Sequence, residues 1–596
     1  MNQFFKFLFA SCLGTALALG LLFFIGIGWL TSLATKMTDE KSATIEPNTV
    51  LELKFDMPIP EKTNNLPLDP FDQEHETVLG LTDMVHAIRR AKDDADIKGI
   101  YLNINYLMAG KATASVLREA LTDFKSSGKF IIAYGNYYTQ GTYYVASVAD
   151  SILMNPLGAV EFTGYSSQIA YFKGMLDKLD VQMRIFYAGK FKSATEPFRL
   201  DKMSDENRLQ VREYLNGMND IFMHDVAESR KIPVEQLRQY ADSYEGRDAN
   251  RALAARLIDR IAYEDEATAS MKAKIGLGGK DKLRRVSIED YFASKGRGTD
   301  FSAKDKIAVV YLEGSINDGK SGDPGDIYDG KVVKDLRAIR QDDNVKAVVL
   351  RINSPGGSVL ASENILREVT LLKKTGRPVV VSMGDLAASG GYYITCGADS
   401  IFAEPNTITG SIGVFGMIPI LQKTMKENLG ITYDTVRTGK FSAFGTPFYD
   451  FSPEESQLIQ QSIDRIYQDF LRKVAESRHK TPEQIHEIAQ GRVWTGKKAK
   501  EIGLVDDLGG LDRALAAASK LAGLEKYRTT EYPRTKKGFE QFLEKFTKDG
   551  DDGEASIKTW MMKEELGEFY PAYKTFADLR KARGLQARLP YALIVE

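Results

Sequence analysis

The stretch "VKAVVLRINSPGGSVLASENILREV" (Val345–Val369) decides the fold of this 596-residue chain. It begins with an apolar, β-branched run that is typical of a buried strand, and a helical pattern follows the turn residues "NSPGG". Strand-like runs lie on both sides of it, "KIAVVYLEGSI" (Lys306–Ile316) before it and "RPVVVSMG" (Arg377–Gly384) after it. Strands that alternate with helices of about 10 to 15 residues predict parallel βαβ units. The fold class is therefore expected to be α/β.

The chain is an internal duplication. The pentapeptide "VAESR" occurs at Val226–Arg230 and again at Val474–Arg478, and the sequence around both copies runs in parallel. The first copy has its own strand-like runs, "TVLELKF" (Thr49–Phe55) and "KFIIAYG" (Lys129–Gly135). A chain of this length exceeds one ordinary core, which agrees with two domains. The predicted divisions are an N-terminus with membrane anchor at 1–36, an N-terminal repeat at 45–271, a linker without a core strand at 272–304, a C-terminal repeat at 305–525 and an extension at 526–596.

The first position at which the two copies disagree is Ser389. When "YGNYYTQGTYYVASVADSI" (Tyr134–Ile152) is laid on "MGDLAASGGYYITCGADSI" (Met383–Ile401), the Tyr-Tyr and Ala-Asp-Ser-Ile elements match, but Gln140 faces Ser389. Ser389 follows a predicted buried strand, and the two glycines after it leave its approach open. We interpret Ser389 as a nucleophile; the alternative is a helix N-cap, a frequent role for serine.

The second disagreement is at Lys192. When "GKFKSATEPF" (Gly189–Phe198) is laid on "GKFSAFGTPF" (Gly439–Phe448), Gly-Lys-Phe and Pro-Phe match, but Lys192 faces Ser442. A serine present only in the second copy and a lysine present only in the first indicate one composite site, to which each repeat supplies one member of a dyad. The alternative for Lys192 is a solvated surface lysine, the state of most lysines.

A serine nucleophile needs a base, and lysine is a better candidate here than histidine. The histidines lie away from the matched strand ends and the glycine-rich loops: His75, His86, His224, His479 and His486. Lys192 acts as a base only as the free amine, so its pKa must fall from about 10.4 toward neutrality by desolvation or by nearby positive charge such as Lys190. Ser411 and Ser193 are candidates for hydroxyls that orient the amine, and both could equally be turn or cap residues.

The turn after the strand of the opening stretch supplies a candidate oxyanion hole. Gly356 and Gly357 permit unusual backbone angles, and N–H groups at the start of a helix stabilise a developing negative charge. The N–H of Gly390 is a second candidate donor. The first copy, "NYLMAGKATASVLREAL", lacks the Pro-Gly-Gly sequence. The oxyanion loop is therefore expected in the second repeat, beside Ser389, unless Pro-Gly-Gly is only a tight turn.

The N-terminal segment predicts a membrane anchor. No charged residue occurs from Phe7 to Ala34, a stretch longer than the roughly 20 residues that cross a bilayer. An uncleaved anchor is favoured over a cleaved signal, whose apolar core spans about 7 to 15 residues. We expect residues 7–34 to span the lipid bilayer once and the body to lie outside the cytoplasm. The net charge of -2 provides no basic field, so nucleic acid is not expected as a partner.

The motifs "SPGGS", "ASGGYY", "TGSIGVFG" and "GKFKSATEPF", in a duplicated chain behind one apolar segment, resemble the signal peptide peptidase A (protease IV) family in its long, two-repeat form. The resemblance implies a membrane-anchored serine endopeptidase of the Ser-Lys type that degrades cleaved signal peptides and other apolar peptides. It implies a crotonase-like or Clp-protease-like fold in each repeat, with Ser389 as nucleophile and Lys192 as general base. It also implies a homotetramer at the bacterial inner (cytoplasmic) membrane, with the catalytic body on the extracytoplasmic, periplasmic side. No cofactor and no metal are expected.

Two other functions are compatible with parts of the sequence. A crotonase-like acyl-CoA enzyme would use the same paired N–H groups, but it would need neither Ser389 nor Lys192. A non-catalytic membrane scaffold would leave the complementary pair of residues unexplained. The apolar C-terminal tail "LPYALIVE" (Leu589–Glu596) is expected to be a packed terminal strand or a docking segment, and entry into a catalytic groove is a further hypothesis for it.

Overall fold

The computed structural model describes residues 45–64, 78–297, 303–320, 325–534 and 586–588. The predicted anchor at 7–34 and the tail at 589–596 lie outside these ranges. None of the helices within them combines the length and the apolar character that crossing a membrane requires.

The first sheet belongs to the N-terminal repeat. Its six strands pair in parallel in the order β6-β4-β3-β2-β1-β7. Helices α2 and α3 bury one face and α10 covers the other, which explains why the central strands are apolar throughout. The strands are β1 Thr49–Leu53, β2 Ile97–Asn103, β3 Phe130–Gly135, β4 Ser151–Met154, β6 Arg260–Ile261 and β7 Arg284–Ser287; the helices are α2 Leu81–Asp93, α3 Lys111–Lys125, α4 Gln140–Ala146, α8 Val234–Asp242, α9 Ala249–Ala254, α10 Glu264–Lys274 and α11 Ile288–Lys295.

The second sheet belongs to the C-terminal repeat and contains the opening stretch of sequence as β11. Its order is β17-β15-β13-β11-β8-β19, with β14 and β18 beside β13; the β15–β17 pair is antiparallel and the other pairs are parallel. The strands are β8 Lys306–Glu313, β11 Val345–Ser354, β13 Val379–Ala388, β14 Ser400–Ala403, β15 Ile408–Gly410, β17 Val493–Thr495, β18 Asp507–Leu508 and β19 Arg528–Tyr532; the helices are α12 Asp329–Gln341, α13 Val359–Lys373, α14 Gly390–Thr395, α16 Pro482–Ile488, α17 Gly496–Glu501 and α18 Leu511–Leu521. The predicted α/β class is therefore confirmed.

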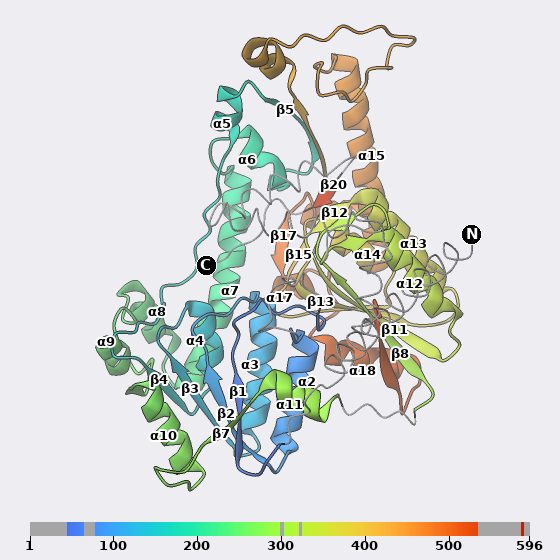
Figure 1. Ribbon diagram of the computed structural model, residues 1–596. Helices are drawn as coiled ribbons and strands as arrows, with labels where there is room; N and C mark the ends of the chain where they lie inside the picture. Colours follow the sequence, from blue (N-terminus) through green and yellow to red (C-terminus); the bar gives the residue numbers. More distant parts are fainter. Residues whose placement is uncertain (1–44, 65–77, 298–302, 321–324, 535–585, 589–596) are drawn as a thin grey trace, which may run out of the picture.

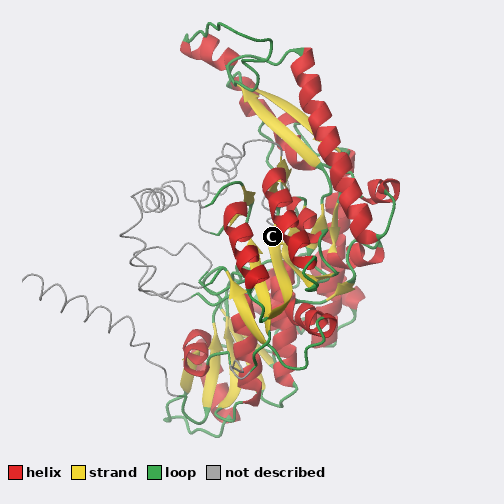
Figure 2. Cartoon of the chain, turned by 90° about the vertical axis from the view of Figure 1, so that its right-hand side faces the viewer, coloured by secondary structure: helices red, strands yellow, loops and turns green. Residues whose placement is uncertain are grey.

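The third sheet joins the two repeats. Its order is β10-β9-β12-β20-β16-β5, and β5 of the first repeat pairs antiparallel with β16 of the second, from Ala188 opposite Val414 to Gln182 opposite Ile420. The paired strands and α15 extend away from the two main sheets (Figures 1 and 2). The remaining elements are β5 Gln182–Ala188, β9 Ile316–Asn317, β10 Ile327–Tyr328, β12 Gly356–Ser358, β16 Val414–Ile420, β20 Gln586–Arg588, α5 Lys173–Lys178, α6 Glu196–Arg199, α7 Asp205–Arg230 and α15 Pro453–Arg478, with a 3-10 turn at Ser193–Thr195 and a π turn at Thr424–Asn428.

The duplication is visible in two matched helices. Helices α7 and α15 are each 26 residues long, and each begins after a serine whose side chain accepts a hydrogen bond from a backbone N–H of the first turn. Each ends at the arginine of "VAESR", and the next residue, Lys231 or His479, adopts the left-handed conformation with φ of 55° or 52°. The same sequence thus ends the same helix in both repeats.

Two sequence predictions about the connecting segments are wrong. The segment at 272–304 is not a linker without a core strand, because it contains β7, which pairs with β1 at the sheet edge, and helix α11. The second repeat does not end at residue 526, because β19 takes the corresponding place beside β8. Both strands were missed because "RRVS" and "RTTEY" are short and largely polar, as edge strands often are.

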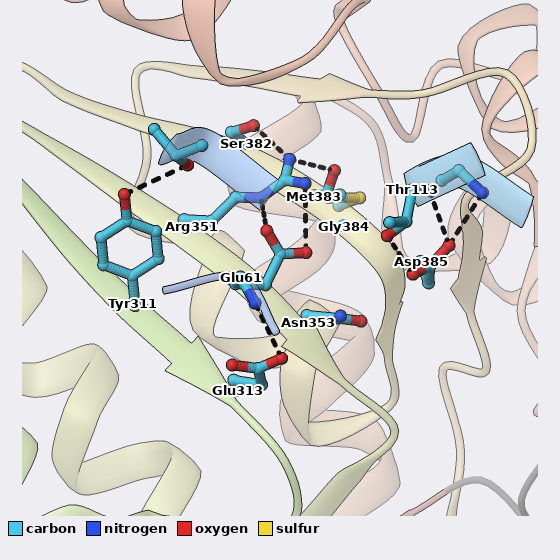
Figure 3. A network of polar contacts seen from close by, with 12 residues as sticks. Glu61, Thr113, Tyr311, Glu313, Arg351, Asn353, Ser382, Met383, Gly384 and Asp385 are labelled. Carbon is cyan, nitrogen blue, oxygen red and sulfur yellow. Dashed lines mark hydrogen bonds and ion pairs between the residues drawn. The ribbon is translucent and has the colours of Figure 1, made fainter. Parts of the chain in front are cut away.

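Polar contacts hold the first repeat against the carboxyl ends of β11 and β13 (Figure 3). Arg351 on β11 donates to both carboxylate oxygens of Glu61, at 2.8 and 3.1 Å, and also to Ser382 and Met383. Asp385 on β13 accepts hydrogen bonds from Ala112 N, Thr113 N and Thr113 Oγ1 at the start of α3. The N-terminus of α3 therefore binds a carboxylate of the second repeat. The corresponding helix of the second repeat, α13, instead begins directly after the glycine-rich turn.

Candidate active site

Lys192 reaches the second repeat because the strand before it is part of the shared sheet. After β5 ends at Ala188, Phe191 N donates to Gln490 O at 2.9 Å. Gly189 has φ of 101°, and a Cβ there would lie 2.4 Å from the Gln490 carbonyl carbon. Gly491 has φ of 79°, and a Cβ there would lie 2.7 Å from Lys192 Cα. Two close backbone approaches that only glycine allows therefore fix the lysine against the loop after α16.

The Lys192 amine is buried among hydroxyls. Its Nζ lies 2.9 Å from Ser389 Oγ, 2.9 Å from Ser411 Oγ and 3.3 Å from Ser411 O. The residue is 1% exposed, and burial lowers the pKa of its amine from 10.5 to about 7. Desolvation has this effect because it penalises the charged ammonium. A large fraction of the amine is therefore unprotonated at neutral pH.

Ser389 sits at a strained turn between β13 and α14. It is fully buried, its φ is 54° and its ψ is −114°, and its backbone N donates to Gly410 O at 2.8 Å. Positive φ is uncommon for serine and marks positions where backbone strain serves a purpose. Ser389 occupies the N-cap position of α14, but its side chain makes no cap hydrogen bond. Its Oγ instead lies near Lys192 Nζ and 3.4 Å from Gly413 O.

The glycine-rich turn runs beside this serine. Ser354 on β11 is in register with Ala387 on β13, so the residues that follow each strand end are neighbours. Gly356 has φ of 98°, and its N–H donates to Ser354 Oγ at 3.1 Å. Gly357 is buried in β12, and Gly390 is the first residue of α14. Of the three candidate oxyanion glycines, Gly356 thus already has an acceptor for its N–H, and Gly357 lies in a strand that is paired with β9 and β20.

Comparison with known families agrees with this geometry. The family model "Peptidase family S49" matches residues 123–278 and again 371–525, one match in each repeat. The chain belongs to peptidase family S49. The model "Clp protease" matches residues 310–409, which include β11, β13 and the end of β8. The S49 chain therefore has a Clp-protease-like α/β fold with tandem family repeats.

Relatives of the S49 chain carry peptidase names. It is 39% identical to "Protease 4" of Salmonella typhi over 76% of this chain and 74% of that protein. It is 32% identical to "Serine protease SPPA, chloroplastic" of Arabidopsis thaliana, over 75% of this chain and 66% of that protein. It is 37% identical to the "Putative signal peptide peptidase SppA" of Enterococcus faecium, over 49% of this chain and 79% of that protein. The chain is a serine peptidase, as the sequence predicted.

In this S49 chain, the residues that align with Lys192 and Ser389 in the other repeat, Ser442 and Gln140, have other hydrogen-bond partners. Ser442 is exposed in a turn, and its Oγ donates to Gly439 O at 2.8 Å. Gln140 is buried, and its Oε1 accepts from Thr163 N and Gly164 N at 3.2 and 2.9 Å. Ser193, the second candidate for orienting the amine, accepts a hydrogen bond from Gln210 Nε2 at 3.1 Å. Its hydroxyl is therefore engaged with α7, whereas Ser411 contacts the amine.

Sequence reasoning missed two features of the site. The first is the loop at Gln490 and Gly491, which contacts Lys192 across the repeats; "IAQGR" gave only the signal of a helix end. The second is the partner set of Glu196, which lies four residues after Lys192. Its carboxylate is buried and accepts from Ser204 Oγ and Asn207 Nδ2 at 2.5 and 2.9 Å.

In the described ranges, no group of three or more His, Cys, Asp or Glu side chains is placed to hold a metal ion.

Proposed function

We propose that this S49 peptidase is a Ser-Lys endopeptidase in which Ser389 is the nucleophile and Lys192 is the general base. The observation that carries the proposal is the 2.9 Å approach of Lys192 Nζ to Ser389 Oγ, with burial lowering the pKa of the amine to about 7. A general base works best when its pKa lies near the operating pH. In this proposal the N-terminal repeat supplies the base and the C-terminal repeat supplies the nucleophile.

The acylation step follows from the positions of these atoms. The neutral Lys192 amine takes the proton of the Ser389 hydroxyl while Oγ attacks the scissile carbonyl carbon. The carbonyl oxygen becomes an oxyanion, and the N–H groups of Gly357 and Gly390 are the proposed donors to it. When the C–N bond breaks, the Lys192 ammonium returns its proton to the leaving amine. An acyl-Ser389 ester and a free peptide amine result.

Deacylation reverses these roles with water as the nucleophile. The Lys192 amine takes a proton from the water as it attacks the ester carbonyl, and the ammonium then protonates Ser389 Oγ as the ester bond breaks. Ser411 Oγ and O hold the amine throughout, so we assign Ser411 a positioning role. Positioning matters because small displacements of a base from its attack geometry cost large factors in rate.

We infer that the substrates are cleaved signal peptides and other apolar peptides. One relative is named a putative signal peptide peptidase, and the apolar run at 7–34 would keep the catalytic body at a membrane surface. In this proposal the run is a single-pass anchor in a bacterial inner membrane, with the body on the extracytoplasmic side. An apolar peptide that leaves the bilayer would reach the site without crossing bulk water.

We further propose a homotetramer. The feature that supports an assembly is the exposed apolar stretch at 429–444, which runs into the second copy of the lysine segment, Gly439–Phe448. Val436 is 96% exposed and Leu429 is 60% exposed, and four more large apolar or aromatic side chains are exposed there: Ile431, Tyr433, Phe441 and Phe444. Exposed apolar surface of this kind is typical of protein contacts. Light scattering of the chain in detergent measures the mass of the assembly. Val436→Asp, which places a charge in the exposed stretch, should lower that mass.

The catalytic proposal is tested by pH dependence and by labelling. Hydrolysis of an apolar, signal-like peptide should rise with pH, with kcat/KM reaching half its plateau at about pH 7, because only the neutral amine is a base. A serine-reactive phosphonate should label the wild type but not Ser389→Ala. Lys192→Ala, folded as judged by circular dichroism, should lose activity at every pH. If Lys192→Ala keeps wild-type activity, the base lies elsewhere.

A further inference from the structure

Arg351 marks a third position at which the two copies of the repeat disagree. When "IKGIYLNIN" (Ile97–Asn105) is laid on "VKAVVLRIN" (Val345–Asn353), Asn103 faces Arg351. The Asn103 amide donates at 3.0 Å to a carboxylate on β1 of its own repeat. Arg351 instead binds Glu61, which belongs to the first repeat and lies between β1 and α2 (Figure 3). The arginine of the second repeat therefore depends on a carboxylate of the other repeat.

The Arg351–Glu61 pair is enclosed at the carboxyl end of the second sheet. Both residues are 2% exposed. The guanidinium also donates to Ser382 Oγ and Met383 O on β13, at 2.8 and 2.9 Å. The backbone N–H of Glu61 donates to Glu313 Oε1, at the end of β8, at 3.1 Å. The pair thus connects the ends of β8, β11 and β13, and removal of either partner would leave a buried charge without its counterion.

The pair lies where β13 departs from its register with β11. Ile352 of β11 is in register with Met383 of β13. The next paired positions are Ser354 and Ala387, so β11 advances two residues while β13 advances four. The residues that pair between β2 and β3 of the first repeat show no such shift. A β-bulge bends its strand and re-aims the side chains that follow it. Ser389 follows this bulge directly, two residues after Ala387.

The Glu61 carboxylate lies against this bulge. A Cβ on Gly384 would lie 2.3 Å from Glu61 Oε1 and 3.0 Å from Asn353 Cβ, so a larger residue there would displace the carboxylate. Inside the bulge, Leu386 N donates to Asn353 Oδ1 at 3.0 Å. Strand β11 continues from Asn353 into the glycine-rich turn, and β13 continues from Leu386 to Ser389. A shift of the carboxylate would therefore move both strand ends that form the site.

We propose that Glu61 is a positioning residue for the nucleophile: through Arg351 it holds the β13 bulge in the form that aims Ser389 at Lys192. The proposal rests on the proposed function, because it takes Ser389 as the nucleophile. The first repeat then acts on the dyad in two ways. It supplies Lys192 as the base, and it supplies Glu61 to fix the strand that carries the nucleophile. Small displacements of reacting groups cost large factors in rate, so this strand end must be held closely.

The rate of phosphonate labelling measures the nucleophile alone, and peptide hydrolysis measures full turnover. Glu61→Gln keeps the size of the side chain and removes its charge. At a temperature where circular dichroism shows this variant folded, its labelling rate and kcat should fall by about 10-fold to 100-fold, with KM within about twofold of wild type. The acid limb of the pH profile should stay in place, because Lys192 keeps its burial. Glu61→Asp, which keeps the charge, should recover part of the loss.

Arg118→Met is the matched control. Arg118 is also a buried arginine, at 7% exposed, but it bonds backbone carbonyls of α4 and α7 within the first repeat. Its loss should lower the melting temperature and leave kcat unchanged, whereas Glu61→Gln should lower both.

A double variant, Glu61→Met with Arg351→Met, separates positioning from stability. Replacement of a whole buried ion pair by apolar side chains often leaves stability unchanged, whereas loss of one partner lowers it. If the pair positions Ser389, kcat should stay low in the double variant although the melting temperature recovers. If the pair only stabilises the fold, kcat should recover as well.

Three results would overturn the proposal: an unchanged labelling rate in folded Glu61→Gln, recovery of kcat in the double variant, and an acid limb that moves in Glu61→Gln. The last result would mean that the effect passes through Lys192 and not through Ser389. Where the double variant does not fold, the labelling rate and the pH profile of Glu61→Gln decide. Absence of labelling in the wild type would instead refute the catalytic proposal itself.

Discussion

Lys192 is 1% exposed, and burial is the cause that lowers the pKa of its amine to about 7. A buried lysine beside a free carboxylate would be held as an ammonium, which is not a base. Glu196 is the acidic residue nearest in sequence, but its carboxylate binds Ser204 and Asn207 at the start of α7. The fold therefore meets two conditions at once: it removes water from the amine and it gives the neighbouring carboxylate other partners.

Ser411 is the residue expected to position the amine. Ser411→Ala removes one of the two hydroxyls at 2.9 Å from Lys192 Nζ, so kcat/KM should fall by about 10-fold to 100-fold. An acceptor stabilises the ammonium, so its loss should also move the acid limb of the pH profile to lower pH. Full pH profiles check both effects. Ser193→Ala is the control, because Ser193 Oγ contacts Gln210 instead. An unshifted acid limb in Ser411→Ala would contradict the positioning role.

The sequence singled out the two residues of the proposed dyad because the duplication provides an internal comparison. Ser389 and Lys192 each stand where the other copy has a different residue, and the structure brings the two within 2.9 Å of each other. The backbone strain at Ser389, with φ of 54°, could not be predicted. It depends on the pairing of β13 with β15 and on the hydrogen bond from Ser389 N to Gly410 O, which are long-range contacts.

The element that delivers the lysine is the strand pair β5–β16, which crosses from one repeat to the other. The α/β class and most strands were predictable from apolar runs, because buried parallel strands are continuous in hydrophobicity. The shared sheet was not, because β5, "QMRIFYA", pairs with a strand of the other repeat and no local pattern encodes that partner. Strand β20 was not predicted for the same reason: it has only three residues, and its partners lie far away in the sequence.

The two copies of the lysine segment allow a matched test of this delivery. Gly189→Ala places a Cβ 2.4 Å from the Gln490 backbone at a φ of 101°, so the segment should shift and kcat/KM should fall by at least about 100-fold. Gly439→Ala changes the corresponding glycine, whose Cβ would meet nothing within 4 Å, and should stay within about twofold of wild type. Peptidase kinetics on both folded variants measure the difference. Comparable losses in the two would show that the Gln490 contact does not fix Lys192.

At the scale of the whole molecule, the proposed mechanism requires the two repeats to keep a fixed relation, because each supplies one residue of the proposed Ser389–Lys192 pair. Asp385 binds the N-terminus of α3 through three hydrogen bonds from the other repeat. Asp385→Ala should therefore lower the melting temperature by about 2 to 6 °C and reduce kcat as the repeats loosen. Calorimetry with parallel kinetics measures both. Asp343→Ala, at a fully exposed side chain, is the control. If Asp385→Ala keeps the wild-type melting temperature and kcat, this contact does not hold the two repeats in place.

Stability against pH reports the state of Lys192 without any substrate. Between about pH 7 and pH 10.5 the unfolded chain binds a proton at this lysine that the folded chain does not, so the wild type loses stability relative to a chain with an uncharged side chain there. The destabilisation that Lys192 causes has its full size below about pH 7, and it disappears as the pH approaches 10.5. Lys192→Met should therefore melt higher than wild type at pH 6, and the gap should narrow at pH 8 and again at pH 10. Lys190→Met, which changes an exposed lysine two residues away, is the matched control. A gap that stays constant from pH 6 to pH 10 would mean that the folded chain keeps Lys192 protonated, and the Ser-Lys mechanism would then lack its base.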